Sequence, residues 1–557
     1  IMGVFQNNLM GAAAAAASGG ATGFYTHQIA NSLRFNKADS SFLTMTPSAG
    51  GDQKTWAISF WAKRCGLGLG SWGNEACMAW DDGASGGAYS NIISWHRTGD
   101  KLNMGTGYSY TLHTTQSYRD TSAWYHIVIL ADTTQAVAAN RWKMYTNGVQ
   151  IESFDDETLP PQDYDFPNVA KSAVYIGKAG GSAYSAGSAN LYLAEMAFVE
   201  GTAYAIGDFG ETKNGVWIPK DVSGLTFGDE GWYLKFESSS DLGNDSSGNN
   251  NDFTLTNIAA DNQTLDSPTF SSTDGNGGNF CTGNVLLYNP NTVWSEGNLK
   301  ITTSANNMGT MCNFQVPLTG KWYWEVLYDD QYSGGTAAWV GVAPADTDLT
   351  DDPEDDAKGL QYYSYDGQKV FEGTLSAYGA TWAEDDIISV AVDRDADTIQ
   401  FYKNGAGQGT IDISGLADDE FFPYFGVTGV AGQQGSFFNF GQEGTFGGAI
   451  TAGGNADVTG YGNFKYDPGD FKALCSGNLP TADAVDPAQT DDDFTQELFF
   501  MSQYAGNLSG RTITTENQPD LMFIRSYNGA QNWYVLDSTR VITDNKYVLT
   551  NDDAAEA

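Results

Sequence analysis

Positive charge is scarce in this sequence. Its 557 residues include 27 Lys and Arg against 68 Asp and Glu, which gives a formal net charge of −41. Affinity for the phosphates of nucleic acids and of anionic membranes depends on clustered Lys and Arg, and the sequence contains no such cluster. It also contains no apolar run as long as a membrane-spanning helix. We therefore expect no nucleic-acid partner and no membrane insertion.

Cysteine and histidine are scarce as well. The five cysteines form no C-x-x-C pair, so zinc and thioredoxin-like chemistry have no support in the sequence. They are Cys65, Cys77, Cys281, Cys312 and Cys475. The sequence leaves open whether one disulfide forms within region 23–272 and another within region 273–446. None of the four histidines lies at metal-ligand spacing from another His or Cys. His126, inside an apolar run, is expected to be a hydrogen-bonded structural residue.

Carboxylates are plentiful, but they do not form a catalytic pattern. A glycoside hydrolase that carries both its carboxylates on one strand needs an E-x-D-x-x-E run, and none occurs. Asp393–Asp397 has the spacing that opens a calcium loop but lacks the required glycine, so we interpret it as a turn between strands. The acidic stretch Asp346–Asp356 is expected to be an exposed loop, with Ca²⁺ binding as the alternative. We predict no enzymatic activity and no cofactor apart from Ca²⁺, which stays open; the residues of any metal site are unknown.

Glycine and aromatic residues, in contrast, are abundant. The chain contains 66 Gly, and Phe, Trp and Tyr make up 13% of it. Aromatic side chains on pleated surfaces, with Gly in the turns, are typical of all-β proteins. A chain of this length is too long for one core. We therefore predict an all-β fold of tandem antiparallel β-sandwiches, preceded by a short N-terminal helical anchor.

The region 23–272 reads as short strands separated by polar turns. Thr55–Lys63 places Trp56, Ile58 and Phe60 on one face, and Trp124–Ala131 is apolar on both faces, as expected of a central strand. Arg141–Ile151 predicts a hairpin, because Asn147-Gly148 supplies the left-handed pair of a type I′ turn. A further strand is expected at Asn190–Glu200.

The region 273–446 repeats this pattern. Lys321–Tyr328 alternates, and Asp386–Asp393 leads into a hairpin over Thr398–Gly405 with its corner at Asn404-Gly405. Both regions therefore place an Asn-Gly hairpin turn after an Ile/Val-rich strand. This shared feature suggests two sandwiches of one architecture.

Three further segments complete the predicted organisation. Residues 1–22 form an Ala-rich anchor, since Ala is the best helix former and the run lacks the basic and Leu-rich parts of a secretion signal. Residues 447–490 form a Gly-rich linker. Residues 491–557 begin another β domain, which we expect to be truncated because a few strands cannot close a sandwich.

The first sandwich resembles a laminin-G/concanavalin-like module, a jelly roll. The resemblance rests on SLRF at Ser32–Phe35, TWAISFWAKR, WYHIVI, WKMYTNG and YLAEMAFVEG, which follow one another in family order. It covers nearly all of Gly23–Gly201 and implies the fold, but it says little about a ligand.

The second sandwich resembles a SPRY domain. The matching motifs are KWYWEV, VGVA, DIISVAVD, TIQFYKNG, FPYFGV and NFGQ, in family order. SPRY modules bind partners, usually peptides, through loops at one end of the sandwich.

Pro519–Arg540 resembles a module found downstream of such domains in phage proteins. Together with the MGVFQNNLMGAAAAA start, the combination is similar to tail-fibre or other structural proteins of marine bacteriophages, which implies a place on the exterior of a virion.

Aromatic residues in or next to polar turns are the candidate ligand-binding residues, because sugars stack on exposed aromatic rings. Most are expected to be buried packing residues. The candidates are Trp72, Trp80, Trp95, Tyr108 and Tyr110 in the first sandwich and Tyr362, Tyr363, Tyr365 and Tyr378 in the second.

We hypothesise a virion adhesin. The N-terminal segment would contact other virion proteins, the chain would form a homotrimer, and the sandwiches would bind host surface glycan or protein. A capsid decoration subunit is the first alternative, and a secreted glycan-binding protein or glycosidase is the second.

Overall fold

The structure is a computed structural model that describes most of the chain between residues 24 and 479. The described ranges are 24–67, 75–81, 91–96, 98–106, 110–166, 169–180, 188–289, 291–303, 308–330, 338–350, 358–417, 420–428 and 434–479, with three short strands beyond residue 520. The chain divides into two compact units, Ile1–Thr481 and Ala482–Ala557. Within the described residues, regular structure is β apart from short 3-10 turns, so the all-β prediction is confirmed. The predicted helical anchor, 1–22, lies outside the described residues.

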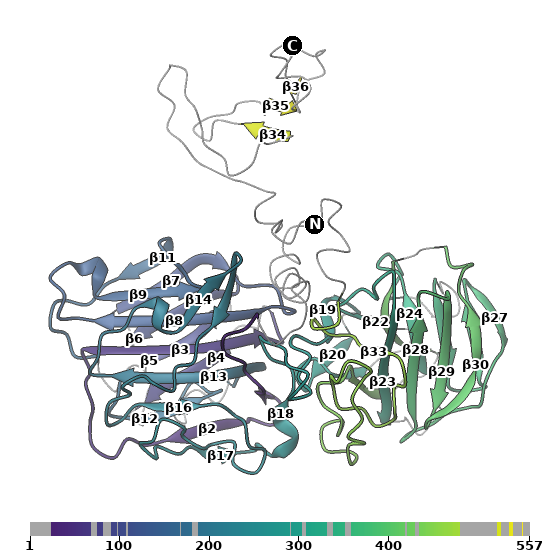
Figure 1. The fold of residues 1–557 in the computed structure, drawn as a ribbon, viewed down its shortest axis with the longest axis horizontal. Coiled ribbons are helices and arrows are strands. Elements are labelled where there is room, and N and C mark those ends of the chain that lie inside the picture. Colours follow the sequence, from purple (N-terminus) through teal and green to yellow (C-terminus); the bar gives the residue numbers. More distant parts are fainter. Residues whose placement is uncertain are drawn as a thin grey trace. The chain divides into compact units, whose positions relative to one another are not determined.

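Two antiparallel sheets of eight strands form the first sandwich (Figure 1). One sheet contains β1 (Ser32–Phe35), β3 (Thr55–Arg64), β8 (Trp124–Asp132), β9 (Trp142–Thr146), β10 (Val149–Gln150), β13 (Leu191–Glu200), β16 (Trp232–Leu234) and β18 (Gln263–Thr264). The other contains β2 (Phe42–Met45), β4 (Glu75–Asp81), β5 (Asn91–His96), β6 (Lys101–Thr106), β7 (Tyr110–Ser117), β11 (Phe154–Thr158), β12 (Ala173–Ile176) and β17 (Thr254–Thr256). A separate hairpin joins β14 (Gly210–Lys213) to β15 (Val216–Pro219). The predicted sandwich is therefore present; its laminin-G assignment stays a prediction.

The central strands of the first sandwich are buried on both faces. In β3, Trp56, Ile58 and Phe60 point into the core between the sheets, as their alternation predicts. Its other face is also covered, because Ala57 packs in a separate cluster with Phe209 and Phe227 from the segment that follows β13. The first sheet is therefore the middle layer of this sandwich, since it has apolar contacts on each side.

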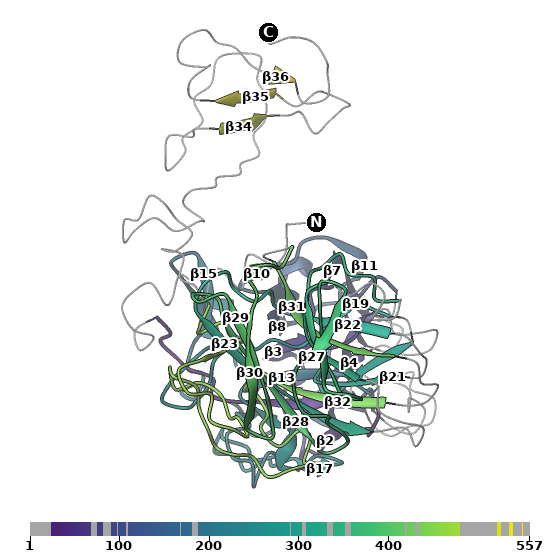
Figure 2. The same ribbon diagram turned by 90° about the vertical axis from the view of Figure 1, so that its right-hand side faces the viewer.

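The second sandwich consists of a seven-stranded antiparallel sheet and an eight-stranded sheet that is antiparallel apart from one short parallel pairing (Figure 2). The first of these contains β19 (Gly283–Tyr288), β22 (Met308–Cys312), β24 (Ala338–Ala343), β25 (Leu360–Tyr363), β26 (Gln368–Phe371), β27 (Thr374–Ala377) and β31 (Phe422–Val427). The second contains β20 (Thr292–Ser295), β21 (Lys300–Thr303), β23 (Lys321–Asp330), β28 (Ile387–Asp393), β29 (Thr398–Lys403), β30 (Ala406–Asp412), β32 (Gln434–Asn439) and β33 (Lys472–Ala473).

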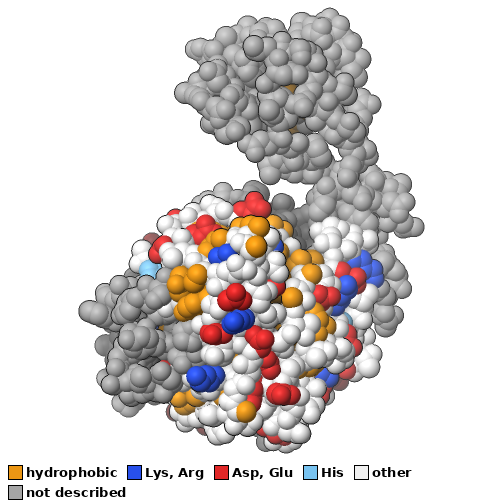
Figure 3. All heavy atoms as spheres, turned by 90° about the vertical axis from the view of Figure 1, so that its left-hand side faces the viewer, with side chains coloured by type: hydrophobic (Ala, Val, Ile, Leu, Met, Phe, Trp, Pro, Cys, Tyr) orange, Lys and Arg blue, Asp and Glu red, His pale blue; other side chains and the backbone are white. Residues whose placement is uncertain are grey.

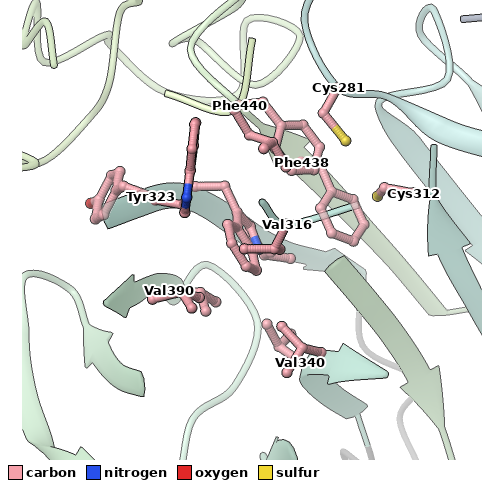
Figure 4. Close-up of a cluster of buried hydrophobic side chains, with 14 of the residues drawn as sticks. Cys281, Cys312, Val316, Tyr323, Val340, Val390, Phe438 and Phe440 are labelled. Carbon is pink, nitrogen blue, oxygen red and sulfur yellow. The ribbon is translucent and has the colours of Figure 1, made fainter. Parts of the chain in front are cut away.

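Aromatic and branched side chains fill the space between these sheets (Figure 4). Val340, Val390 and Phe438 come from three different strands and have no exposed surface. All five cysteines of the chain are buried free thiols. Cys281 and Cys312 lie at the edge of this core with their sulfurs turned toward each other (Figure 4), and burial raises the pKa of the Cys312 thiol.

The segment after β32 packs on the second sandwich. Phe446 packs in a small cluster on the outer side of β23 and β32, β33 pairs in parallel with β23, and Phe464 is fully buried. The predicted Gly-rich linker, 447–490, is described as far as Leu479. This described part therefore forms an outer layer on the eight-stranded sheet.

A buried polar cluster joins the two sandwiches. The ammonium of Lys63 on β3 donates to Asp266 Oδ2 and to Asn279 Oδ1, each at 2.7 Å. The Trp124 indole donates to the second oxygen of Asp266 at 2.9 Å. Lys63 and Asp266 are 1% and 0% exposed. Because 266–280 leads directly into β19, this cluster fastens the start of the second sandwich to the first.

In the C-terminal unit, β34 (Leu521–Ile524), β35 (Tyr534–Asp537) and β36 (Val548–Leu549) form an antiparallel sheet. These strands lie within 491–557, where the sequence predicts the start of another β domain.

Candidate binding site

The candidate aromatics of the first sandwich that the structure describes are mainly core residues. Trp80 and Trp95 are 0% and 1% exposed. Trp80 packs against Trp56 at 5.8 Å between ring centroids, and Trp95 lies under the guanidinium of Arg64 at 5.1 Å. Neither tryptophan therefore offers a ring face to a ligand. Tyr110 is half-buried, and Trp72 and Tyr108 lie outside the described residues.

In the second sandwich, the four candidate tyrosines differ in how much of each side chain is exposed to solvent. Tyr362 is 0% exposed, Tyr363 is 8% exposed and Tyr365 is 66% exposed, while Tyr378 is half-buried. They occupy the end of β25, the turn after it and the segment after β27. Only Tyr365 of these four presents most of its side chain to solvent.

Tyr365 lies beside an aromatic stack. Trp339 on β24 and Tyr363 on β25 are stacked at 3.9 Å with an interplanar angle of 5°, and the Tyr365 ring lies beside this pair, 6.2 Å from Tyr363 and tilted by 42°. The Trp339 indole donates to Thr428 Oγ1 at 2.8 Å, which fixes the buried end of the stack. The exposed tyrosine therefore lies on a rigid base.

The segment after β27 is held by hydrogen bonds with tyrosine and glutamine side chains, and its Ala380 amide donates to Gln408 Oε1 at 2.9 Å. The Tyr378 hydroxyl donates to the Gly409 carbonyl at 2.5 Å and accepts from the Phe401 amide at 3.1 Å. The Tyr362 hydroxyl donates to the Ala380 carbonyl. Burial raises the pKa of Tyr378 to about 12, so this phenol stays protonated and keeps donating at neutral pH. The backbone beside the exposed tyrosine is thus fixed.

Tyr365 is the one aromatic side chain among the large apolar residues that are well exposed in the described part of the chain. The others are Val137, Val149, Leu255, Leu286, Val293, Leu318, Leu375, Val458, Leu521 and Ile524. A tyrosine that combines exposure with a rigid base is typical of an interface anchor, since little rotamer freedom is lost on binding. Tyr365 is one of the nine aromatic residues that the sequence offers as ligand-binding candidates, but only the structure separates it from its buried neighbours.

Basic side chains do not form a polyanion-binding patch on the face shown in Figure 3. On the face shown in Figure 3, carboxylates and basic side chains are interspersed among the described residues. Near Tyr365, Asp366 accepts from the Gln368 side chain at 2.7 Å, and Lys369 lies over the ring of Tyr378 at 5.5 Å. The surroundings of the exposed tyrosine are therefore polar and of mixed charge.

A second, polar cleft of about 390 Å³ is lined by Tyr25, Thr26, His27, Gln28 and residues 271–273. His27 Nε2 lies 2.6 Å from Glu195 Oε1. Burial lowers the pKa of His27, but the bond to Glu195 outweighs it and raises this pKa overall. The imidazole is therefore already paired and holds the segment before β1 against β13.

The most perturbed carboxylate in the second sandwich is structural. Glu325 on β23 accepts from the backbone amides of Lys465 and Tyr466 at 2.9 and 2.8 Å and from the Tyr323 hydroxyl at 3.0 Å. Burial raises its pKa to about 6. These bonds satisfy both carboxylate oxygens, so Glu325 fastens the outer segment to the sheet.

His126 is a structural residue, as predicted. It stacks on Trp61 at 4.5 Å, pairs with Ser59 Oγ at 2.8 Å, and accepts from the Trp217 indole at 2.8 Å. Burial lowers its pKa to about 3, so the imidazole is neutral.

The Asp393–Asp397 run is also structural, as predicted. It forms a turn between β28 and β29, in which Asp393 Oδ1 accepts from two backbone amides of the turn.

The described residues contain no group of three or more His, Cys, Asp or Glu side chains placed to hold a metal ion. The acidic residues 351–357 lie outside the described ranges. No helix in the described part of the chain is long and apolar enough to cross a bilayer.

Two sheets packed over a shared apolar core place the second module among the β-sandwich domains. More specifically, residues 321–443 match the SPRY domain family, so the chain contains a SPRY domain, which is a protein-interaction fold. The match covers this domain and does not assign the rest of the chain.

Several solved structures are similar to this part of the chain. The SPRY domain of human HERC1 is 17% identical, with a TM-score of 0.24, over 27% of this chain and 96% of that one. A second human SPRY domain is 18% identical, with a TM-score of 0.22, over 27% of this chain and 94% of that one. Stonustoxin is 16% identical, with a TM-score of 0.23, over 28% of this chain and 27% of that one.

Proposed function

We propose that this chain is a non-catalytic binding protein on the exterior of a bacteriophage particle, and that its SPRY domain contacts a partner protein through the surface around Tyr365. The binding role is carried by one observation: a protein-interaction fold presents an exposed tyrosine beside a rigid aromatic stack. Tyrosine contributes a large amphipathic contact area at low entropic cost, and such anchors dominate interface energetics.

The place on a virion is supported by the resemblance of the N-terminal segment and of the successive modules to marine bacteriophage proteins. In this proposal the chain is a tail-fibre or other adhesin subunit, assembled as a homotrimer, and its ligand is a glycan or protein of the host surface. The strong net negative charge suits a protein that remains dispersed in salt water. A capsid decoration subunit is the alternative, since it would use the same sandwiches.

The binding surface is tested with a library of random 12-residue peptides panned on the purified chain. Peptides selected on the wild type should bind the Tyr365→Ala variant about tenfold or more weakly, because loss of an anchor typically costs more than 1 kcal/mol. Val149→Ala, at a position 71% exposed in the first sandwich, is the matched control and should bind like wild type. Equal binding to all three proteins would remove Tyr365 from the proposed surface.

The place on the virion is tested separately. Antiserum raised against the purified chain should label bacteriophage particles, and quantitative mass spectrometry of those particles gives the copy number. A handful to a few dozen copies fits a tail fibre, whereas hundreds of copies fit capsid decoration. Particles from which the chain is absent would contradict both versions.

A further inference from the structure

Two of the four histidines of the chain meet on the outer side of the first sandwich. His96 ends β5 and His113 lies in β7, with β6 between them. In the register of the sheet, His96 is opposite Lys101 and His113 is opposite Asn103. The two ring centroids are 4.7 Å apart, with an interplanar angle of 55°. Seventeen positions of sequence separate these histidines, so the sequence gives no motif for the pair.

Each imidazole has a nitrogen available for a ligand. His96 Nδ1 accepts from the Thr98 amide at 3.2 Å in one tautomer and donates to the Thr98 carbonyl at 3.4 Å in the other. Only the second tautomer, in which Nδ1 carries the proton, leaves a free lone pair on Nε2, and a metal ion bound at Nε2 would select it. A backbone carbonyl in this position is the usual orienting partner of a metal-bound histidine. His113 Nε2 is buried and has no hydrogen-bond partner in the described structure.

The spacing of the rings suits a shared ion. Metal–nitrogen distances of about 2.0–2.1 Å place two imidazole centroids about 5 Å apart around one tetrahedral ion, close to the separation seen here. Carboxylates also lie nearby: Asp156 on β11 is opposite His113 in the sheet, and Asp155 forms an ion pair with Lys101. Since Lys101 already neutralises Asp155, Asp156 is the carboxylate whose negative charge favours a cation at this place.

We propose that His96 and His113 bind one transition-metal ion of the zinc type through their Nε2 atoms, with water in the remaining coordination positions. Imidazole ligands select Zn²⁺, Ni²⁺ or Cu²⁺ over the oxygen-seeking Ca²⁺ and Mg²⁺. The bound ion joins β5 to β7 across β6. The site is independent of the SPRY surface and differs from a calcium loop in both its ligands and its location.

Calorimetric titration of the full chain with ZnCl₂ in a non-chelating buffer tests the proposal. We expect a site that takes one Zn²⁺ per chain, weakened about tenfold or more in His96→Gln and in His113→Gln. His27→Gln is the matched control, because His27 belongs to another part of the same sandwich, and it should bind like wild type. An affinity that neither His96→Gln nor His113→Gln reduces would overturn the proposal.

Two further measurements do not depend on the variants. A tenfold excess of CaCl₂ should leave the Zn²⁺ titration unchanged; displacement would assign the ion to carboxylates and overturn the proposal. In wild-type protein, Zn²⁺ should slow the modification of the more accessible imidazole, His96, by diethyl pyrocarbonate, as read by peptide mass spectrometry. Equal modification with and without Zn²⁺ would also overturn it.

Discussion

Tyr363 and Tyr365 lie two residues apart, yet their replacement should have different effects. Tyr363 is stacked against Trp339 and is 8% exposed, whereas Tyr365 is 66% exposed. Removing a large buried aromatic costs about 3–5 kcal/mol, and most surface substitutions stay within about 0.5 kcal/mol. We expect Tyr363→Ala to lower the free energy of unfolding by about 3 kcal/mol or more and Tyr365→Ala to leave it nearly unchanged. Urea unfolding measures both, and equal losses would contradict the assignment of Tyr365 as a surface anchor.

Glu325 should make the stability of the SPRY domain depend on pH. Burial raises its pKa from 4.5 to about 6, so the folded state holds this proton more tightly than the unfolded chain does. The resulting stabilisation is complete below pH 4.5 and is lost as the pH rises through 6, and it amounts to about 2 kcal/mol.

The comparison with Glu325→Gln isolates this effect, because glutamine does not titrate. The difference in unfolding free energy between wild type and variant should fall by about 2 kcal/mol between pH 4 and pH 7, as measured by urea unfolding at each pH. A difference that stays constant over this range would show that Glu325 titrates normally in the folded protein.

At the scale of single residues, the sequence predicts the chemical role of a side chain better than it predicts how exposed that side chain is. It identifies His126 as structural, because a histidine inside a strand apolar on both faces must be buried. It cannot separate Tyr365 from Tyr362, since burial depends on which strands and turns pack above them. The pairing of His96 with His113 is likewise invisible, because it follows from the register of three strands.

At the scale of elements, the repeated Asn-Gly corners combine a turn with a side-chain hydrogen bond. Asn404 and Gly405 have φ values of 49° and 79°, as a type I′ turn requires. Asn404 Oδ1 also accepts from the Ile387 amide at 2.9 Å. In the first sandwich, Asn147 accepts from the His126 amide in the same way at 2.8 Å. Each asparagine therefore ties the hairpin to the preceding strand.

Replacing Asn404 by Gly keeps the turn conformation but removes this acceptor. The buried Ile387 amide then lacks its partner, which costs about 1–3 kcal/mol. Asn214→Gly is the matched control, because Asn214-Gly215 forms the same turn with φ values of 51° and 74° and the structure gives its exposed side chain no hydrogen bond. Thermal unfolding should show a lower midpoint for Asn404→Gly than for Asn214→Gly. Equal midpoints would mean that the turn alone stabilises the hairpin.

The strands with strong patterns were predictable, but their environment was not. The Ile/Val-rich strands β8 and β28 and their hairpins follow from alternation and Asn-Gly corners. Alternation in Lys321–Tyr328 indicates one buried face, whereas β23 is buried on both, because Glu325 and Leu327 face the outer segment after β32. That segment is rich in Gly and polar residues, and its packing depends on specific backbone hydrogen bonds that composition does not reveal.

At the scale of the whole N-terminal unit, two sandwiches share a buried ionic connection. Lys63 belongs to the first sandwich, and Asp266 and Asn279 belong to the chain that leads into the second. A second connection lies nearby, where buried Arg34 pairs with Glu296 at 2.9 Å. Buried charges of this kind fix a particular geometry, because any other arrangement leaves a charge unpaired and dehydrated. The two ion pairs therefore connect the start of the second sandwich to the first.

Lys63→Met tests whether this connection stabilises the unit. The substitution leaves the carboxylate of Asp266 buried without its cation, which costs about 3–5 kcal/mol. Lys54→Met is the matched control, because Lys54 pairs with Asp163 at 3.9 Å on the surface, where the two side chains are 36% and 64% exposed; exposed pairs contribute about 0–1 kcal/mol. Adding Asp266→Asn to Lys63→Met removes the unpaired charge, so the double variant should recover part of the loss. Differential scanning calorimetry measures all four proteins. If the two lysine variants are equally stable, or if the double variant recovers nothing, the two sandwiches are held together by their apolar contacts rather than by this ion pair.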